Sequence, residues 1–465
     1  MSASRAPSLT GSIGRFQLFA LGFGSIIGSA WVVILNEWLD VAGPGGAVIG
    51  FLAGGAVILA IGACYAEMVT RIPATGGEYI FATRVYGPTT GFFVGWFLAL
   101  SWICVTIFEG LAVPRFLDLL LPPLADQVLY QSFGAPVTRN HLLMGALGVV
   151  AIGTVNYLGG TAMARFQGLF TYGFLGIALV VLLFMVANGT SANLAPFLPL
   201  DAERSWWSGA ITIFASCAFL LNGFQSVTQA VEERASGLSL ASLARIMMGA
   251  IVAGTAFYCL AVLAASSIVP WERLAASQMA MIRAAAALPF GSWFVPLILV
   301  GVIISLIKTW NAMFMMAARV LLALARDGML PRQLARIDPR TGSPTRAVLV
   351  VGVLNLLGLF LGRGAVTAMV DMSATSIVFC FVLVCVAVPV LRRAQGTTAP
   401  FQVPGGMKLV VPAIAGAVVM SLAALVSPLL RASGVPLEHL LLSCWAAIGA
   451  AFWLASGRRL RNPPG

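Results

Sequence analysis

The sequence predicts an all-α integral membrane protein, and three observations lead to this fold class. The 465 residues are 60% apolar and only 9% charged, whereas soluble domains carry roughly 25% charged residues. Apolar runs recur at lengths near the ~20 residues that a spanning helix needs. Lysine and arginine are distributed unevenly between alternate loops. An outer-membrane barrel is excluded, because its strands would be ~10-residue alternating segments.

The apolar runs predict twelve transmembrane helices, with both chain ends in the cytoplasm. Of the 27 Lys and Arg residues, 19 then fall on the cytoplasmic side, 7 on the other side, and Lys308 within a span. This asymmetry follows the positive-inside rule, so membrane topology explains the net charge of +11 and nucleic acid is not an expected partner. We expect a multi-pass protein of a cell (inner or plasma) membrane. The expected spans are 15–38, 44–69, 88–113, 141–158, 164–188, 206–231, 243–269, 291–326, 345–361, 366–391, 407–428 and 437–457.

The chain shows none of the residue patterns that an enzyme or metalloprotein would need. His141 and His439 both fall at outer helix ends, and no phosphate-binding loop, nucleophile triad or acid–base pair is present. The seven cysteines lie in apolar spans without a CxxC pair and are expected to be small core side chains. No secretory signal is expected, and we predict neither a cofactor nor a metal.

Two of the apolar stretches are interrupted by small and polar residues. The first break is Gly24-Ser-Ile-Ile-Gly28-Ser29, and the second is Asn222-Gly-Phe-Gln-Ser226. Hydrocarbon penalises unpaired backbone groups, so a spanning helix should break only where the freed groups are used. Broken helices in corresponding positions of two halves indicate the substrate site of a secondary transporter.

The position of the two breaks predicts an inverted repeat of five helices. Residues 15–188 would form the first repeat and residues 206–392 the second, with the broken helix first in each. Because five is odd, the second repeat enters the membrane from the opposite side. Residues 406–457 would add two further transmembrane helices.

The breaks offer complementary partial charges to a zwitterion. A half-helix N-terminus suits a carboxylate, and a half-helix C-terminus suits an amine. Glycine lets the backbone approach a ligand closely, and Phe219, one turn before the second break, could cover it. Alternatively, the small residues only allow close helix packing, and Phe219 is ordinary packing. The candidate substrate-binding residues are Ser25, Ile26, Ile27, Gly28, Ser29, Ala30, Phe219, Asn222, Gly223 and Gln225.

Lys308 is the outstanding charged residue, since it lies deep in the eighth span of a chain with only two lysines. Ionisable groups in a span are candidates for function, and a desolvated lysine could load and release a proton. The alternative is that Lys308 snorkels to an interface.

Glu109 and Asp371 are expected at outer helix ends, as interfacial or ion-paired groups. Glu232 and Glu233 end span 6 and could pair with arginines.

At these residues the chain resembles the amino acid–polyamine–organocation (APC) transporter superfamily, which has the LeuT-like fold. Gly24 to Ala30 is similar to the family's broken first helix, and Arg71 to Tyr79 to its loop between spans 2 and 3. Similar elements are 219–233 in span 6 and 311–331, which runs from the second half of span 8 into the loop after it. The resemblance implies that Ser25 to Ala30 hold a substrate carboxylate, that carbonyls near Asn222 hold the amine, and that Phe219 is a gate.

The chain departs from the family at positions that bear on coupling. Ala30 and Gln225 replace residues that are often glycine and acidic, and Phe174 or a neighbour lies where some proton-coupled relatives carry a lysine. Lys308 falls where sodium-coupled relatives use small hydroxyl residues. We therefore hypothesise that its ammonium stands in for sodium.

The sequence is best explained by a secondary transporter that imports or exchanges amino acids by alternating access. A neutral substrate is expected, because few acids line the proposed site, and proton coupling is possible by way of Lys308. The alternatives are a polyamine or organic amine antiporter of the same fold, a membrane-embedded enzyme, or a channel. The lipid bilayer is the expected environment, and the sequence leaves the oligomeric state open.

Overall fold

The computed structural model describes residues 12–121, 127–200, 205–396, 398–431 and 436–461. Arg5 and Arg204, which contribute to the charge asymmetry, lie outside the described residues. Within this part of the chain, nine helices are long and apolar enough to cross a membrane, and two shorter apolar helices are Trp206–Leu220 and Thr345–Leu359. The all-α membrane fold is thus confirmed, while the count of twelve spans and the two repeats stay predictions.

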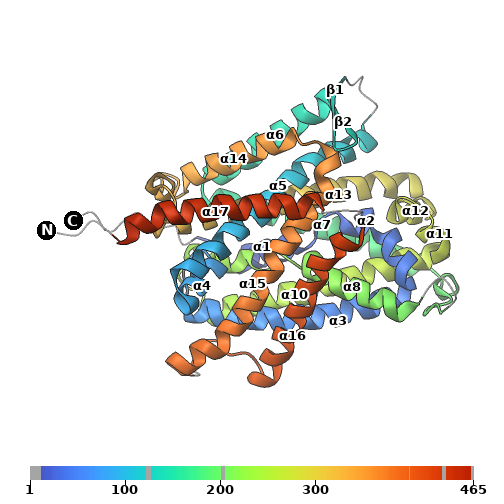
Figure 1. Cartoon of the computed structure of the whole chain (residues 1–465). Coiled ribbons are helices and arrows are strands. Elements are labelled where there is room, and N and C mark those ends of the chain that lie inside the picture. The colour runs from blue at the N-terminus through green and yellow to red at the C-terminus, as the bar shows by residue number, and fades with distance from the viewer. Residues whose placement is uncertain (1–11, 122–126, 201–204, 397, 432–435, 462–465) are drawn as a thin grey trace.

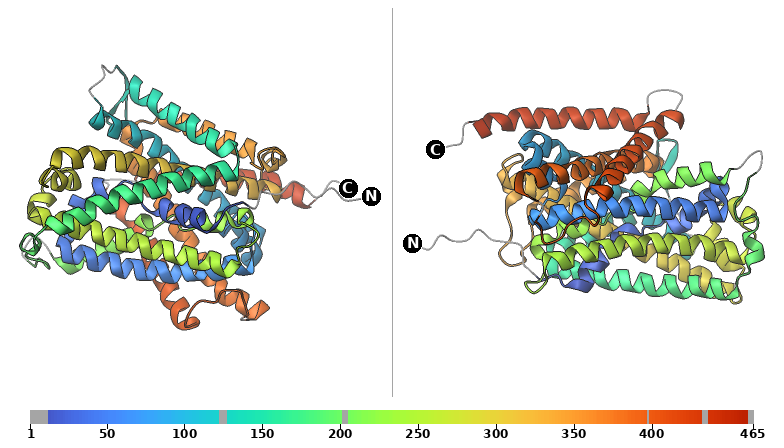
Figure 2. Two further views of the ribbon diagram at one scale, coloured as in Figure 1. Left: turned by 180° about the vertical axis from the view of Figure 1, so that it is seen from behind. Right: turned by 90° about the horizontal axis from the view of Figure 1, so that it is seen from below.

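Most of the long helices run roughly parallel in one bundle, and some helices of the C-terminal part cross the others obliquely (Figures 1 and 2). The helices of the first half are α1 (Arg15–Ile26), α2 (Ala30–Val33), α3 (Leu35–Arg71), α4 (Glu78–Tyr86), α5 (Pro88–Leu120), α6 (Arg139–Tyr157) and α7 (Gly160–Asn188). Those that follow are α8 (Trp206–Leu220), α9 (Ser226–Gln229), α10 (Leu240–Ile268), α11 (Trp271–Ala275), α12 (Ala280–Ala286), α13 (Gly291–Arg326), α14 (Thr345–Leu359), α15 (Val366–Gln395), α16 (Met407–Arg431) and α17 (Leu437–Arg461). Four 3₁₀ turns connect them: η1 (Ser191–Leu194), η2 (Val231–Glu233), η3 (Arg332–Ala335) and η4 (Arg363–Ala365).

A small antiparallel hairpin stands at one end of the bundle, which we call the hairpin end. It pairs β1 (Val128–Ser132) with β2 (Ala135–Thr138) and is adjacent to η4 at the start of α15. The opposite end carries α4, η2 and the last turn of α13, and we call it the α4 end (Figure 1). The hairpin lies in the stretch between the predicted spans 88–113 and 141–158, for which the apolar pattern predicts no strand.

The break in the first predicted span is at the expected place, but that span ends differently. Helix α1 stops at Ile26 and α2 begins at Ala30. The expected boundary between spans 1 and 2 is instead inside α3, which kinks at Gly43 with φ of 63° immediately before Pro44. Glycine tolerates this positive φ, and proline blocks a continuous hydrogen-bond ladder, so a kink forms where a loop was expected.

The second break lies between α8 and α9, at residues Leu221 to Gln225. Here Gly223 has φ of 116°, a backbone conformation that favours glycine. A Cβ atom on Gly223 would lie 2.6 Å from the Ser25 Cβ atom. The two interrupted helices therefore touch each other at their breaks.

Small residues explain how closely α3 packs against α8, which carries the second broken span. A Cβ atom on Gly50 would lie 2.7 Å from the Ala210 carbonyl oxygen, and one on Gly54 would lie 2.6 Å from the Cys217 Cβ atom. Such small-residue contacts let membrane helices approach closely. The core of the bundle is thereby tight around the broken helices.

Helix α4 covers the α4 end of the bundle. Its first turns are buried in protein: Glu78 and Tyr79 are fully buried, and so is Phe81. Gly77 packs so tightly that an added Cβ atom would lie 2.6 Å from Gln229 Nε2 of α9. Two glycines preceding the helix make this close approach possible, so α4 plugs the end of the bundle.

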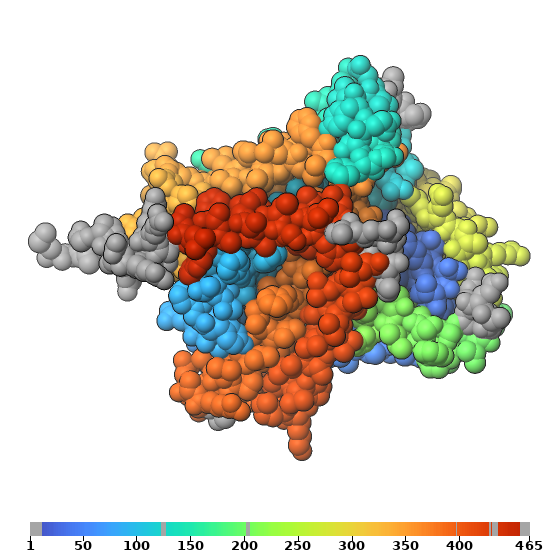
Figure 3. Space-filling view, in the orientation of Figure 1, coloured from blue at the N-terminus to red at the C-terminus, as the bar shows by residue number. Residues whose placement is uncertain are grey.

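The last helix is peripheral. Helix α17 lies on the outside of the molecule, next to α5 and α15 (Figure 3). One of its contacts is a pair of stacked indoles, Trp96 of α5 and Trp445, with centroids 4.4 Å apart. Each indole N–H donates to the carbonyl oxygen of the other residue, at 2.9 and 3.0 Å.

Candidate substrate cavity

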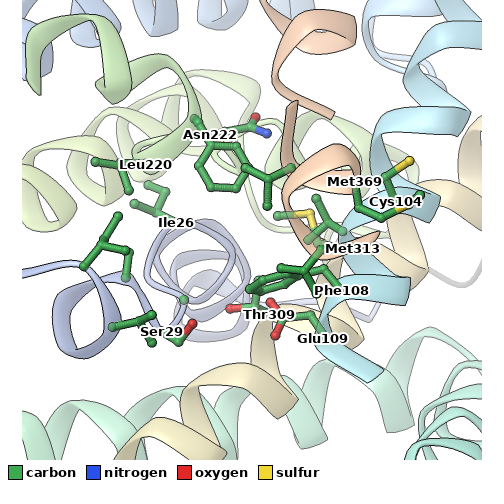
Figure 4. A pocket seen from close by; sticks show the side chains of 18 of the residues that line it. Ile26, Ser29, Cys104, Phe108, Glu109, Leu220, Asn222, Thr309, Met313 and Met369 are labelled. Atoms are coloured by element: carbon green, nitrogen blue, oxygen red, sulfur yellow. The ribbon is translucent and has the colours of Figure 1, made fainter. Parts of the chain in front are cut away.

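A cavity of about 390 Å³ lies where the two broken helices meet. Helices α5, α13 and α15 complete its wall, and it extends toward the hairpin end, where the exposed side chain of Glu37 lines it. Figure 4 shows side chains from these helices converging on the space between Ile26, Asn222 and Glu109. A concave, mainly apolar space with a few polar groups is typical of a small-molecule site.

Seven of the ten predicted substrate-binding residues line this cavity. They are Ser25, Ile26, Gly28, Ser29, Ala30, Phe219 and Asn222. The other three, Ile27, Gly223 and Gln225, are not among the lining residues and instead build the frame around it. Gly223 packs against Ser25, and its N–H donates to Gln225 Oε1 at 2.8 Å. The Gly223 N–H and the Gln225 side-chain oxygen, two of the groups predicted to bind substrate, are therefore paired with each other within the turn.

The first break presents backbone donors to the cavity. Within the described residues, the N–H groups of Gly28 and Ser29 donate to no protein acceptor. They precede the first turn of α2, as orphan N–H groups at a helix start do. A Cβ atom on Gly28 would meet nothing within 4 Å. The space beside these donors is therefore open, and it suits a carboxylate. The Ser25 hydroxyl is already used, since it donates to the Leu21 carbonyl oxygen at 2.6 Å.

The carbonyl groups freed by the first break are held by three side chains of one helix turn of α13. Lys308 Nζ donates to the carbonyl oxygens of Gly24, at 2.9 Å, and Ile27. Thr309 Oγ1 lies 3.1 and 3.2 Å from the same two oxygens. Ser305 Oγ lies 2.9 Å from the carbonyl oxygens of Ile27 and Gly28. Of these three side chains, Thr309 also lines the cavity, whereas Ser305 and Lys308 are not among the lining residues.

Lys308 is fully buried and does not snorkel. Its ammonium lies 4.6 Å from the centroid of the Phe174 ring on α7, a cation–π contact. Glu109 of α5 carries the opposite charge and is close enough to interact with it electrostatically. The lysine is not a lining residue of the cavity, so it is placed to hold the first break rather than to contact a ligand directly.

The second break presents an acceptor to the cavity. Asn222 is 4% exposed, and its Oδ1 atom is buried without a hydrogen-bond partner among the described residues. Tyr258 of α10 bridges the two breaks, with its hydroxyl 3.4 Å from the Ile26 carbonyl oxygen and 3.3 Å from that of Leu220. A buried amide oxygen without a partner is unfavourable unless a ligand donor satisfies it.

Sequence reasoning missed the residues that unbroken helices contribute to the cavity. Glu109 was expected at a membrane interface, but it is 2% exposed, lines the cavity, and has its Oε2 atom without a partner in the described structure. Asp371 also lines the cavity. The criterion that singled out Lys308, a charge inside an apolar span, would also have found Glu109. The missed lining residues are Cys104, Val105, Phe108, Glu109, Tyr258, Thr309, Met313, Met369 and Asp371, among others.

The α4 end of the bundle is closed by a polar network that we call the α4-end seal. It comprises Thr75, Glu78 and Tyr79 from the α4 region, Gln229, Glu232 and Glu233 at the end of the second broken helix, and Arg319, Arg326 and Asp327 of α13. Arg319 donates to Glu233 at 2.7 Å, with both side chains buried, and Arg326 Nη1 lies 3.1 Å from Glu232 Oε2. The expected pairing of Glu232 and Glu233 with arginines is confirmed.

The α4 region joins this network directly. The Thr75 N–H donates to Glu232 Oε1 at 2.8 Å, and the Tyr79 hydroxyl donates to Asp327 Oδ2 at 2.5 Å. Burial and the adjacent Asp327 carboxylate both raise the pKa of Tyr79 well above its usual range, so this hydroxyl stays a donor. The seal thereby connects α4, the second broken helix and α13 on the side away from the cavity.

Two helices that break beside a central cavity, in a bundle of membrane-spanning helices, define a membrane transporter of small molecules. Among the described residues, no group of three or more His, Cys, Asp or Glu side chains is placed to hold a metal ion. The profile of the amino acid permease family matches residues 13–451. The chain belongs to this family of the APC superfamily, and it is a transporter rather than an enzyme.

Characterised relatives cover most of the chain at low identity. The branched-chain amino acid permease BcaP of Bacillus subtilis is 26% identical over 90% of this chain and 88% of its own length. The cationic amino acid transporter 4 of Mus musculus is 26% identical over 86% of this chain but 62% of its own length. The aspartate–proton symporter of Bacillus subtilis is 23% identical over 85% of this chain and 75% of its own length. The names of these relatives include branched-chain, cationic and acidic substrates, so family membership leaves the charge of the substrate open.

Proposed function

We propose that this transporter carries neutral amino acids across a cell membrane by alternating access, with coupling to protons. One observation carries the proposal: the cavity has unused N–H groups of Gly28 and Ser29 on one wall and the unpartnered Oδ1 atom of Asn222 on another. A substrate α-carboxylate would accept from the first pair, and its α-ammonium would donate to the second. These are the two charges that every α-amino acid presents.

A neutral side chain is supported by the rest of the cavity wall. Val105, Phe108, Met313 and Met369 are apolar lining residues. Glu109 and Lys308 interact electrostatically, so this pair of opposite groups would add no net charge to the cavity. Methionine side chains adapt to irregular shapes, and an apolar side chain of moderate size would fill this wall. The printed name of BcaP, a branched-chain amino acid permease, agrees with such a substrate.

Proton coupling is proposed through Lys308. Its ammonium holds the carbonyl oxygens of Gly24 and Ile27 in place, and these groups belong to the helix whose other side would bind the substrate carboxylate. Loss of the proton would weaken both hydrogen bonds and free α1 to move relative to α13. The lysine would thereby link the protonation state to the geometry of the substrate site, as sodium would in a sodium-coupled relative.

We further propose that the α4 end faces the cytoplasm and that the two five-helix units, 15–188 and 206–392, are inverted repeats. The uneven distribution of Lys and Arg supports this orientation. The cavity extends toward the hairpin end, and the α4-end seal closes the other side. The structure would then correspond to a conformation open to the outside.

A second candidate is an exchanger of organic amines, and the acidic residues of the cavity favour it. Glu37, Glu109 and Asp371 all line the cavity, more acids than the sequence interpretation expected. A diamine or a cationic amino acid would find carboxylates there. The proximity of Lys308 to Glu109 argues against this candidate, because the lysine would compensate any charge on the most buried of the three acids.

Transport by the purified protein in liposomes tests the proposal. Uptake of labelled leucine, alanine, arginine, aspartate and a diamine would be measured with and without an inward proton gradient. We expect saturable uptake of a neutral amino acid that the proton gradient increases and a sodium gradient does not. Uptake restricted to the diamine or to arginine would replace the neutral proposal by the amine candidate. A lack of saturable uptake for every amino acid and amine would overturn both.

A further inference from the structure

The structure contains a buried ionisable group that neither lines the cavity nor interacts with Lys308. Glu78 is the first residue of α4 and is fully buried. Its Oε2 atom accepts a hydrogen bond from Gln229 Nε2 at 3.3 Å. Its Oε1 atom is buried without a hydrogen-bond partner in the described part of the chain. A buried carboxyl in this situation is expensive to ionise.

The groups that face Glu78 do not supply a positive charge. Tyr65 of α3 and Cys380 of α15 are the titratable neighbours that it influences electrostatically, and both are neutral near pH 7. Gln229 contributes an uncharged amide from α9. The arginines of the seal on α13 are committed elsewhere, Arg319 to Glu233 and Arg326 to Glu232. Within the described residues, no Lys or Arg is paired with Glu78.

The electrostatics of this position favour the protonated form. Burial raises the pKa of Glu78 to about 7 from its ordinary value of 4.5, outweighing the favourable interactions of the carboxylate with polar neighbours such as Gln229. The group is thus half protonated near physiological pH while the seal is closed. Contact with water would return its pKa toward the ordinary value.

The position of Glu78 ties its exposure to opening of the seal. It is enclosed by α3, α4, α9 and α15, and α9 is the short inner half of the second broken helix. The neighbouring Gly77 is in tight contact with Gln229 and Thr228 of α9. Separating α4 from α9 would therefore admit water to the carboxyl of Glu78. A path from the cavity to the α4 end requires such a separation somewhere in this contact.

We propose that Glu78 is a proton-binding site that stabilises the closed α4-end seal when protonated and releases its proton to the α4 side when the seal opens. The inference rests on alternating access as proposed above, but not on the identity of the substrate or on Lys308. It gives the transporter a proton site that lies outside the cavity, because Glu78 is not among the lining residues. It also makes the seal sensitive to the pH on the α4 side.

The sign of the pH dependence follows from linkage. Because the pKa of Glu78 is higher in the closed state than in the open state, the closed state binds the proton more tightly. Acidification on the α4 side therefore stabilises the closed seal, and this advantage is lost as the pH rises through about 7. For pKa values of about 7 and 4.5, the closed-to-open ratio falls about tenfold between about pH 6 and pH 8.

Protonation of Glu78 can be measured directly in the purified full-length protein by infrared spectroscopy. The wild-type protein should show a protonated carboxylic acid band at pH 6 that disappears with a midpoint near 7, and Glu78→Gln should remove this component. The matched control is Glu37→Gln, since Glu37 is an exposed acid at the hairpin end, and this variant should keep the band. If the wild-type and Glu78→Gln spectra titrate identically, the proposal is overturned.

Opening of the seal can be followed without any substrate through Cys380, which is 1% exposed and faces Glu78. Its rate of maleimide labelling would be measured by mass spectrometry, comparing variants at the same pH so that thiol chemistry is matched. At pH 8, Glu78→Gln should be labelled at least tenfold more slowly than wild type, with the difference shrinking toward pH 5. Equal rates at pH 8 would contradict the role of Glu78 in the seal.

These measurements separate the two proposals. If no amino acid is transported but the infrared and labelling results are as expected, the proposed function fails and the proton site at Glu78 stands. If transport is proton-coupled while Glu78 is ionised at pH 6, the proton site fails alone. Should Glu78→Gln not fold, the same titration in Glu109→Gln still decides, because this variant lacks the other buried acid of the described residues that has an unpartnered oxygen and no arginine partner. A band that disappears with a midpoint near 7 supports Glu78, and its absence overturns the proposal.

Discussion

The two interrupted helices satisfy their freed backbone groups in different ways. At the first break, side chains of another helix, Ser305, Lys308 and Thr309, hold the carbonyl groups. At the second break, the turn is largely self-contained, because Gln225 caps Gly223, and one acceptor, Asn222 Oδ1, is left over. The first break therefore depends on a distant ionisable residue, whereas the second depends on its own local geometry. Such an asymmetry would allow the protonation of Lys308 to change the first break, while the second break keeps its geometry.

Removing the charge at the first break should have the largest effect. In Lys308→Met, the carbonyl oxygens of Gly24 and Ile27 lose their ammonium donor, and we expect accumulation driven by a pH gradient to be abolished. Uptake into proteoliposomes with and without the gradient checks this result. Lys408→Met is the matched control, because Lys408 is the other lysine of the chain and is exposed at the start of α16. Full gradient-driven uptake by Lys308→Met would rule out the coupling role.

Substituting the glycine at the second break should act on stability instead. Gly223→Ala forces a side chain into a positive φ and against Ser25, which we expect to cost about 2–4 kcal/mol. At the first break, a Cβ atom on Gly28 meets nothing, so Gly28→Ala should leave the melting temperature within about a degree or two while weakening substrate binding. Thermal unfolding of the two variants in detergent compares them. Equal melting temperatures would remove the distinction between the breaks.

The unpaired Oδ1 atom of Asn222 at the second break should contribute to the affinity for substrate. Asn222→Ala removes the proposed partner of the substrate ammonium, and a hydrogen bond to a charged group contributes about 1.5–3 kcal/mol, so KM should rise by roughly 10- to 100-fold. Initial rates of uptake measure the change. Asn36→Ala is a suitable control, because Asn36 lies close to the first break but is not among the lining residues. A KM unchanged in Asn222→Ala would place the ammonium elsewhere.

The smallest effect is expected for a single hydroxyl on the outer side of the first break. Ser305→Ala leaves Ile27 with its other donors but deprives the Gly28 carbonyl oxygen of the Ser305 hydroxyl. The loss should be about 1 kcal/mol, visible as a small decrease in melting temperature with coupling retained. If Ser305→Ala uncouples transport as Lys308→Met does, the hydroxyl and the ammonium act as one unit.

The membrane fold and both helix breaks could be predicted from the sequence, because hydrocarbon imposes strict rules on composition and on unpaired backbone groups. The seven lining residues that were predicted all come from the breaks, where small and polar residues stand out. Phe108, Glu109 and Met313 were missed for a physical reason. They lie on helices that are apolar on every side, so periodicity gives no indication of which face turns toward the cavity.

The burial of α4 was missed for a related reason. Its sequence is amphipathic, and the same pattern describes a helix on a membrane surface and one that covers the end of a bundle. Only the close approach allowed by Gly76 and Gly77 distinguishes the two. Similarly, a single sequence shows that Glu78 is acidic, but its isolation from every described cation depends on the three-dimensional pairing of Arg319 and Arg326.

The peripheral position of α17 has a consequence for biosynthesis. All residues that line the cavity lie between Ser25 and Asp371, and α17 contacts the rest of the molecule through residues such as Trp96 and Trp445. During translation, every residue of the cavity wall has therefore been synthesised before α16 and α17. A ribosome-stalled chain that lacks these two helices would already contain the complete set of lining residues.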